Sequence, residues 1–369
     1  MGMPKVLVCG GGFAGVEAAY KLARTGKVEV TLVDPKDYFE LNFITPRAIV
    51  DRDVAQNYVV YKFEDMDNIG RFVQAKVVEL TDDSATLSNG ETISFDYAII
   101  ASGSTYADPI FKGIVPSAEE RLKELEAKYT AIREAKTLVI AGGHYVGCET
   151  AAEFSELPTK PKVTIVQSHC ALMDASPAKT QQYVKDFMEK RGVEVLLDHR
   201  MDIDENGVYS HNGKALDPQP DLVFWATGFK TNNDYVRKGL GDDVMNKANA
   251  VMVDEFLRVK GHPKIFALGD ANDVAEYKLA YLAYQHGDLT CRNILRLIAD
   301  PNGALTAWKP FGGFPMFYLT LGKKKGVLVA KETKHIGWVP TSILGMIAKS
   351  KMTGKALGIK VGVPPSVST

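Results

Sequence analysis

The sequence predicts an α/β fold with two Rossmann-like dinucleotide-binding domains, and three observations support this prediction. A short apolar run at residues 5–9 is followed by the glycine pattern of residues 10–15 and then by a helical pattern. The next apolar run, residues 28–33, ends in Asp34, nineteen positions past Gly15. The same order of strand, glycine-rich turn, helix and strand returns about 130 residues later, so one module is repeated.

The first glycine-rich turn has the features of a nucleotide-binding site. In Gly10-x-Gly12-x-x-Gly15 the first glycine permits a tight turn, the second lets backbone approach a pyrophosphate, and the third lets the helix pack on the strand. The helix N-terminus attracts the anion, and Asp34 can accept a ribose hydroxyl. A turn that only joins a strand to a helix would not need this acid. The residues expected to bind the nucleotide are Gly10, Gly11, Gly12, Phe13, Ala14, Gly15 and Asp34.

Residues 35–48 are predicted to form a loop region that contains one notable cation, Arg47. Its guanidinium is either within reach of the phosphates bound at the first turn or exposed, like most loop arginines. Asn89-Gly90 predicts a hairpin, and a buried strand leads to Gly103, at a strand end where a cofactor would lie. The strands predicted here are residues 76–80, 85–87, 92–94 and 96–100.

The second module follows an amphipathic helix that begins with a capping box at Ser117. A helix is expected from Cys148, and Asn212-Gly213 predicts a second hairpin. The predicted strands are residues 137–140, 163–166 and 221–225, and the glycine-rich turn is residues 142–147. The residues expected to line a second nucleotide site are Gly142, Gly143, Gly147, Gln167 and Gly228.

Two positions of the second module depart from the pattern. His144 stands where the second glycine would let backbone approach the pyrophosphate, so its side chain either displaces the nucleotide or contacts its phosphate. Gln167 stands where an acid would select NAD by binding the ribose and repelling a 2′-phosphate. Without that acid, NADPH is not excluded as the donor.

The end of the chain combines a third glycine turn with a basic tail. A strand at residues 264–268 runs into Gly269-Asp270, and a helix at residues 278–298 follows. His286 in this helix is expected to be a core or boundary histidine, since a lone histidine implies no catalytic partner. Residues 301–369 hold ten lysines and one acid, for a net charge of +9, while the remainder of the chain carries −10.

The composition is that of a globular protein with sizeable cores. The chain has 369 residues, 46% of them hydrophobic, and no apolar run approaches the roughly 20 residues of a membrane span. The first strand begins too early for a signal peptide, so a cytoplasmic location is expected. The absence of a CxxC or CxxxxC pair predicts no metal site and no redox dithiol. The cysteines are expected to be small buried residues, and they are Cys9, Cys148, Cys170 and Cys291.

These motifs resemble the flavoproteins with two dinucleotide-binding domains. Within them the sequence is similar to the apoptosis-inducing-factor-like and ferroptosis-suppressor oxidoreductases, relatives of the type II NADH dehydrogenases. The resemblance implies a glutathione-reductase-like FAD/NAD(P)-binding fold with a small C-terminal α+β region, and it is faint beyond Pro301. The similar stretches are residues 8–15, 32–39, 46–48, 147–149, 163–166, 253–259, 265–270 and 278–283.

The resemblance implies FAD at the first module, NAD(P)H at the second and electron transfer to a quinone-type acceptor. By position, Arg47, Val77 and Gly269-Asp270 would join the first turn in holding FAD, with Asp270 near its ribityl-phosphate portion. Glu149 falls on an acid that faces the flavin and the nicotinamide and relays protons; alternatively it is a carboxylate that the helix dipole stabilises. The implied domains are residues 1–110 and 236–300 for FAD, 111–235 for NAD(P)H, and 301–369 for the quinone or a membrane.

The motifs and the resemblance together predict two alternative functions. The first is an FAD-dependent NAD(P)H:quinone oxidoreductase, which the missing CxxxxC pair favours over the disulfide reductases of the same fold. Its tail would lie on an anionic membrane or lipid-droplet surface with Trp338 and residues 343–347 in the interface, unless the tail is a solvated cationic face with a core helix. The second is an FAD-binding interaction or signalling protein with weak NAD(P)H turnover, which His144 favours. No motif for reading nucleic acid occurs, and a homodimer is left open.

Overall fold

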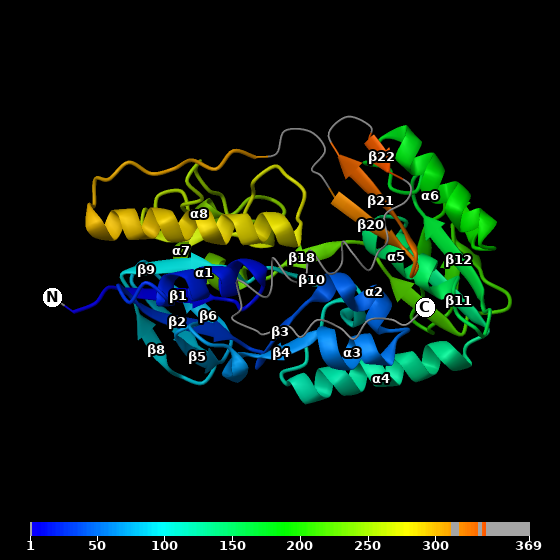
Figure 1. The fold of residues 1–369 in the computed structure, drawn as a ribbon, viewed down its shortest axis with the longest axis horizontal. Helices are drawn as coiled ribbons and strands as arrows, with labels where there is room; N and C mark the ends of the chain where they lie inside the picture. The colour runs from blue at the N-terminus through cyan, green and yellow to red at the C-terminus, as the bar shows by residue number, and fades with distance from the viewer. Residues whose placement is uncertain (1, 311–316, 331–333, 337–369) are drawn as a thin grey trace.

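Two parallel β-sheets, one toward each end of the molecule, organise the fold (Figure 1). The structure is a computed structural model that describes residues 2–310, 317–330 and 334–336. The first sheet has five strands whose spatial order is β19 (Ile265–Ala267), β9 (Tyr97–Ile100), β1 (Lys5–Cys9), β2 (Glu29–Asp34) and β5 (Arg71–Gln74), all paired in parallel.

The second sheet repeats the central part of the first. Its four parallel strands are β13 (Glu194–Leu197), β12 (Lys162–Gln167), β11 (Thr137–Ala141) and β17 (Leu222–Trp225), in that spatial order. Leu7 and Val8 of β1, like Leu138 and Ile140 of β11, are fully buried, because helices or loops cover both faces of a parallel sheet. The predicted α/β fold with a repeated module is therefore confirmed.

A glycine turn leads from each central strand into a helix. α1 (Phe13–Ala23) follows β1, and α5 (Tyr145–Phe154) follows β11. Both helices begin three residues before the predicted positions, because Gly12 and His144 are already the N-cap residues. The remaining helices of seven residues or more are α3 (Arg52–Tyr58), α4 (Ala118–Glu134), α6 (Ala178–Lys190), α7 (Asp234–Leu240) and α8 (Ala280–Ala299).

A two-stranded connector joins the modules. β10 (Ser104–Tyr106) leaves the first sheet and pairs antiparallel with β18 (Phe229–Thr231), which returns to it. Tyr235, just after β18, packs in a core cluster with Leu7 of β1. Two of the predicted domain limits, 110/111 and 235/236, fall a few residues after the two strands of this connector, and all the domain limits stay predictions. The short strands, which include both predicted hairpins, are β3 (Tyr38–Glu40), β4 (Val60–Lys62), β6 (Val77–Leu80), β7 (Ser84–Leu87), β8 (Thr92–Ser94), β14 (Met201–Ile203), β15 (Tyr209–His211) and β16 (Lys214–Ala215).

The prediction of a loop at residues 35–48 is wrong. The segment contains β3, a 3₁₀ turn (Asn42–Ile44) and the short helix α2 (Thr45–Ala48). Glu40 of β3 is held by Arg121 of α4, with Nη2 2.7 Å from Oε1 and both side chains at most 2% exposed. A pair separated by 81 positions leaves no local signal in the sequence.

A third, antiparallel sheet near the C-terminus lies against α5 (Figure 1). It consists of β20 (Phe317–Leu321), β21 (Lys325–Ala330) and β22 (Lys334–Ile336). Alternate residues of β20 are buried in the same core cluster as Cys148 of α5. Trp338 and residues 343–347, predicted to enter a lipid interface, lie outside the described residues.

We expect Gly147→Ala to destabilise the fold. A Cβ on Gly147 would lie 1.8 Å from the carbonyl oxygen of Gly142, so α5 and β11 must separate, at a cost of about 3 kcal/mol in the free energy of unfolding. His144→Ala is the matched control, since this position already carries a Cβ, and it should change the free energy by less than about 0.5 kcal/mol. Urea unfolding measures both; equal losses would contradict the role given to Gly147.

Candidate functional site

Close backbone contacts shape the first glycine turn. Gly10 has a φ of +110°, and a Cβ there would lie 2.4 Å from the Ala101 carbonyl oxygen. A Cβ on Gly15 would lie 1.8 Å from the Gly10 oxygen, so only glycine lets α1 meet β1 this closely. Gly12 differs, because a Cβ there would meet nothing within 4 Å. Open space thus lies beside the N-terminus of α1, whose first N–H groups can bind a pyrophosphate.

Asp34 lies beside this turn at the end of β2. Its Oδ2 accepts a hydrogen bond of 2.7 Å from the Gly11 N–H, and its Oδ1 accepts one of 2.8 Å from the Lys36 N–H. Burial raises the pKa of Asp34, and the charge of Lys36 and the Gly11 N–H oppose the rise. The carboxyl is therefore fixed in the position that the fold uses for a ribose hydroxyl.

The Gly269-Asp270 turn lies against the start of α1. A Cβ on Gly269 would lie 3.8 Å from the Cβ of Ala14, and Asp270 Oδ2 accepts a hydrogen bond of 2.6 Å from the Ser104 hydroxyl. His286 is 1% exposed and accepts a hydrogen bond of 3.1 Å from the Gly269 N–H. The prediction of a core histidine is confirmed, and this histidine holds the turn in place.

Lys112 is a cation that the sequence did not single out. Its Nζ lies 3.3 Å from Ser104 Oγ and 4.0 Å from Asp270 Oδ2. Burial lowers the pKa of Lys112, while the nearby carboxylates of Asp270, Glu40 and Asp34 oppose this. Lys112 thus lies beside the Asp270 carboxylate of the first site, and a lone lysine between Phe111 and Gly113 gives no signal of this in the sequence.

Within the described part of the chain, Arg47 makes its hydrogen bonds to α5 and to the β20–β21 turn, and not to the first glycine turn. Its Nε donates to Glu153 Oε1 of α5 at 2.7 Å, and its Nη2 donates to the Gly322 carbonyl at 2.8 Å. Glu156, just beyond α5, accepts a hydrogen bond of 2.7 Å from the Lys323 N–H. These contacts fasten the β20–β21 turn to α5, and a role of Arg47 in FAD binding stays a prediction.

Three further predicted residues lie at strand ends. Gly103 follows β9 with a φ of +63°, and Gly228 follows β17 with a φ of +105°. β9 and β17 occupy matching positions, each beside the central strand of its sheet. Val77 is buried at the start of β6, opposite Leu87.

The second glycine turn repeats the geometry of the first. Gly142 has a φ of +110°, and its Cβ would lie 2.3 Å from the Ala226 carbonyl oxygen. Gly143 donates its N–H to Gln167 Oε1 at 3.0 Å, just as Gly11 does to Asp34. A neutral amide therefore takes the place of a carboxylate.

His144 fits the turn without displacing the backbone. Its φ and ψ are −96° and −159°, close to the −81° and −168° of Gly12. The imidazole therefore projects from the position where the first turn has open space. Burial lowers the pKa of His144, and the charge of Asp174 opposes this.

Glu149 of α5 connects the second site to the third sheet. Its Oε1 accepts hydrogen bonds from the Thr320 N–H at 2.9 Å and the Thr320 hydroxyl at 2.8 Å. Burial raises the pKa of Glu149 to about 7, and the bonds from Thr320 oppose the rise. Burial, aided by the charges of Asp270 and Glu149, also raises the pKa of Tyr106 to about 12. The charges of Asp270, from the first module, and Glu149, from the second, thus both raise the pKa of the Tyr106 phenol.

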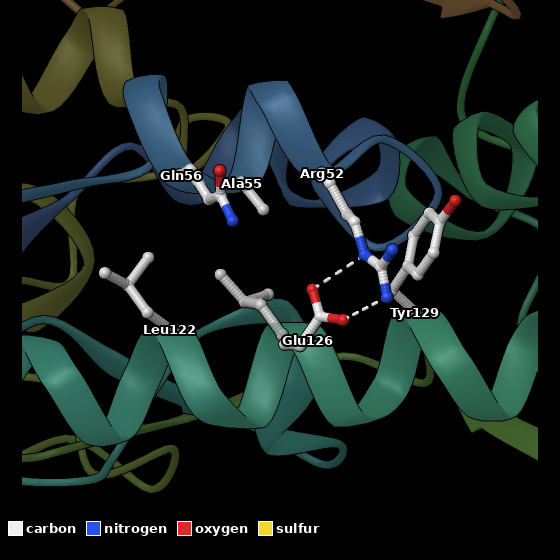
Figure 2. Close-up of a pocket in the computed structure, with 7 residues that line it drawn as sticks. Arg52, Ala55, Gln56, Leu122, Glu126 and Tyr129 are labelled. Carbon is white, nitrogen blue, oxygen red and sulfur yellow. Dashed lines mark hydrogen bonds and ion pairs between the residues drawn. The ribbon is translucent and has the colours of Figure 1, made fainter.

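A separate hollow of about 530 Å³ lies between α3 and α4 (Figure 2). The guanidinium of Arg52 is paired with Glu126 and lies 4.5 Å from the ring centre of Tyr129. None of the residues predicted for the nucleotide sites lines it. Its lining residues are Arg52, Ala55, Gln56, Leu122, Leu125, Glu126 and Tyr129.

The described residues include no group of three or more His, Cys, Asp or Glu side chains that could hold a metal ion. In that same part of the chain, no helix is both long and apolar enough to cross a membrane. Cys9, Cys148 and Cys291 are buried as predicted, but Cys170 is exposed because it lies in the loop after β12.

Two parallel sheets, each with a glycine turn opening a helix, define a flavoprotein class with one FAD and one NAD(P)H module. The sequence profile of the pyridine nucleotide-disulphide oxidoreductase family matches residues 4–287. Human ferroptosis suppressor protein 1 is 32% identical over 335 residues, which cover 87% of each chain. The chain belongs to the pyridine nucleotide-disulphide oxidoreductase family, which confirms the predicted resemblance, oxidoreductase class and cofactors FAD and NAD(P)H.

Solved structures show the same fold. NDH2 from Plasmodium falciparum, in complex with NADH, matches with a TM-score of 0.76 at 15% identity, over 95% of each chain. The sulfide:quinone oxidoreductase of Aquifex aeolicus matches with a TM-score of 0.72 at 16% identity, over 98% of this chain and 93% of its own.

We expect Thr320→Val to raise the pKa of Glu149 above its value of about 7. Valine keeps the backbone N–H but removes the hydroxyl, and a hydrogen bond to a carboxylate favours the charged form. The rise should be about one pH unit. Infrared titration of the protonated carboxyl band measures it, with Glu149→Gln to assign the band. Thr320→Ser should restore the original value, and an unchanged titration in Thr320→Val would contradict the assignment.

Proposed function

We propose that this protein is an FAD-dependent oxidoreductase that passes electrons from NAD(P)H to a quinone-type acceptor. The observation that carries the proposal is the placement of Glu149 in α5, the helix that opens at the second glycine turn, where the N–H and hydroxyl of Thr320 hold its carboxyl. The structural likeness to a sulfide:quinone oxidoreductase supports the acceptor class. The cysteines also favour a quinone over a disulfide as the acceptor. The described residues contain no pair of neighbouring cysteines that could pass electrons to a disulfide.

The first glycine turn, Asp34 and Gly269-Asp270 would hold FAD, which when bound accepts hydride from the nicotinamide and passes the electrons on. Gly12 would leave room for the pyrophosphate, and Lys112, whose Nζ lies 4.0 Å from Asp270 Oδ2, would add positive charge to this site. The second turn, from Gly142 to Gly147 with Gln167, would hold NAD(P)H.

Glu149 would move a proton. A quinone needs two electrons and two protons to become a hydroquinone, whereas a hydride supplies two electrons and one proton. The second proton must come from solvent, and a carboxyl with a pKa of about 7 exchanges protons readily at neutral pH. Thr320 keeps this carboxyl oriented.

The β20–β21 turn presents Lys323, Lys324 and Lys325 at the surface. Such a cationic edge would favour an anionic lipid surface, where a lipophilic quinone is dissolved. Peripheral membrane contact is part of the proposal, and comparison of binding to anionic and neutral liposomes tests it.

The decisive experiment is an anaerobic stopped-flow titration of the FAD-loaded protein with NADH and with NADPH, followed by addition of a soluble quinone. Rapid bleaching of the flavin absorbance and its restoration by quinone are expected. Slow or absent bleaching would contradict the proposal and favour the interaction or signalling function that His144 raises.

We expect Glu149→Gln to slow the quinone-dependent step by about a hundredfold while the flavin stays bound, the low end of the effect of a positioned proton donor. In the wild type this step should slow as the pH rises through about 7, because the carboxyl loses its proton there. The variant should lose this inflection, and Glu120→Gln, exposed in the first turn of α4, is the control. If Glu149→Gln keeps the wild-type rate, Glu149 does not transfer the proton in this step.

A further inference from the structure

Three charged or titratable side chains gather at the second glycine turn. His169 Nδ1 lies 3.0 Å from Asp174 Oδ2, and His144 Nε2 lies 4.0 Å from Asp174 Oδ1. His169 Nδ1 also lies 3.4 Å from the amide nitrogen of Gln167. We call His144, Asp174 and His169 the His–Asp–His cluster.

The cluster extends from the position expected for the pyrophosphate to the position expected for the 2′-phosphate of NADPH. His144 is the N-cap of α5, where the fold binds the pyrophosphate. Gln167 accepts from Gly143 as Asp34 does from Gly11, so it marks the ribose position, where NADPH differs from NADH by a 2′-phosphate. His169 stands two residues beyond that position, and Asp174 joins both ends.

The net charge of the cluster depends on pH. With both imidazoles neutral the cluster carries −1, and with both protonated it carries +1, because Asp174 is the one acid in it. The three side chains are 34% to 64% exposed, so protons exchange freely with solvent. The 2′-phosphate adds nearly two negative charges to the donor. Protonation of the imidazoles at acidic pH therefore weakens the repulsion of the 2′-phosphate, and because burial lowers the pKa of His144, this imidazole gains its charge only at acidic pH.

Neighbouring elements contribute other titratable groups. The ring of Tyr145 lies 4.2 Å from that of His144, and the Tyr277 hydroxyl donates to the Ala175 carbonyl beside Asp174. Asp198 and His199 donate their backbone N–H groups to the carbonyls of His169 and Gln167, and Cys170 is exposed in the same loop. Of these groups, His199 is the one that can add positive charge, and its Nδ1 is 2.6 Å from the Leu197 carbonyl oxygen.

We propose that the His–Asp–His cluster selects the donor, favouring NADPH over NADH at acidic pH and disfavouring it at alkaline pH. This inference rests on the proposed placement of NAD(P)H at the second turn, and it is independent of the acceptor. Asp174 is the specificity-determining residue, since its carboxylate neutralises the histidines and repels the 2′-phosphate.

The test is calorimetric binding of NADP⁺, NAD⁺, 2′,5′-ADP and 5′-AMP to the FAD-loaded protein at pH 6.0 and 8.5. The preference for the 2′-phosphorylated member of each pair should fall about five- to tenfold from the lower to the higher pH, the size of one or two partly exposed charge pairs. Asp174→Asn should strengthen NADP⁺ binding at both pH values, and His169→Gln should weaken it at pH 6.0. NAD⁺ affinity should change little in both variants.

Asp82→Asn is the matched control, because Asp82 pairs with His262 at 2.5 Å outside the nucleotide sites. A preference that is the same at both pH values, or that Asp174→Asn leaves unchanged, would overturn the inference while the proposed function stands. If nucleotide binding follows the prediction but the protein does not reduce a quinone, the proposed quinone-type acceptor would be wrong and the inference on the donor would stand. If Asp174→Asn does not fold, the pH series and His169→Gln decide.

Discussion

The fold depends on one steric constraint, the contact between the third glycine of each turn and the carbonyl oxygen of the first. A Cβ at Gly15 or Gly147 would lie 1.8 Å from that oxygen. The contact draws the helix N-terminus against the central strand and directs its N–H groups into the space beyond the sheet. Both modules obey this constraint with nearly the same geometry, so both present an anion site at the same edge.

Within that shared frame, the two modules differ in charge. Gly11 donates to the carboxylate of Asp34, whereas Gly143 donates to the neutral amide of Gln167. The first turn leaves space beyond Gly12, and the second places an imidazole there. The backbone thus decides that a nucleotide is bound, and a few side chains on it decide which nucleotide is favoured.

The third sheet completes the region between the modules. Thr320 binds Glu149, and the pair of Arg47 and Glu153 reaches the Gly322 carbonyl, so residues far apart in the chain meet on one face of α5. A carboxyl in this environment has a pKa near neutrality because burial outweighs its two hydrogen bonds. A helix-terminal carboxylate in water would have no such property, so burial gives Glu149 its raised pKa and Thr320 of β20 orients the carboxyl.

The sequence by itself determined the repeated α/β modules, the glycine turns and the partner of each turn at the end of the next strand. These features depend on local periodicity and on short spacings, such as that from Gly15 to Asp34, which the chain carries in order. Only the tertiary structure decided that Arg47 pairs with Glu153, that Lys112 lies near Asp270, and that Thr320 holds Glu149. Each of these contacts joins segments that are distant in the chain, and its energy comes from burial and charge pairing that exist only once the modules are assembled.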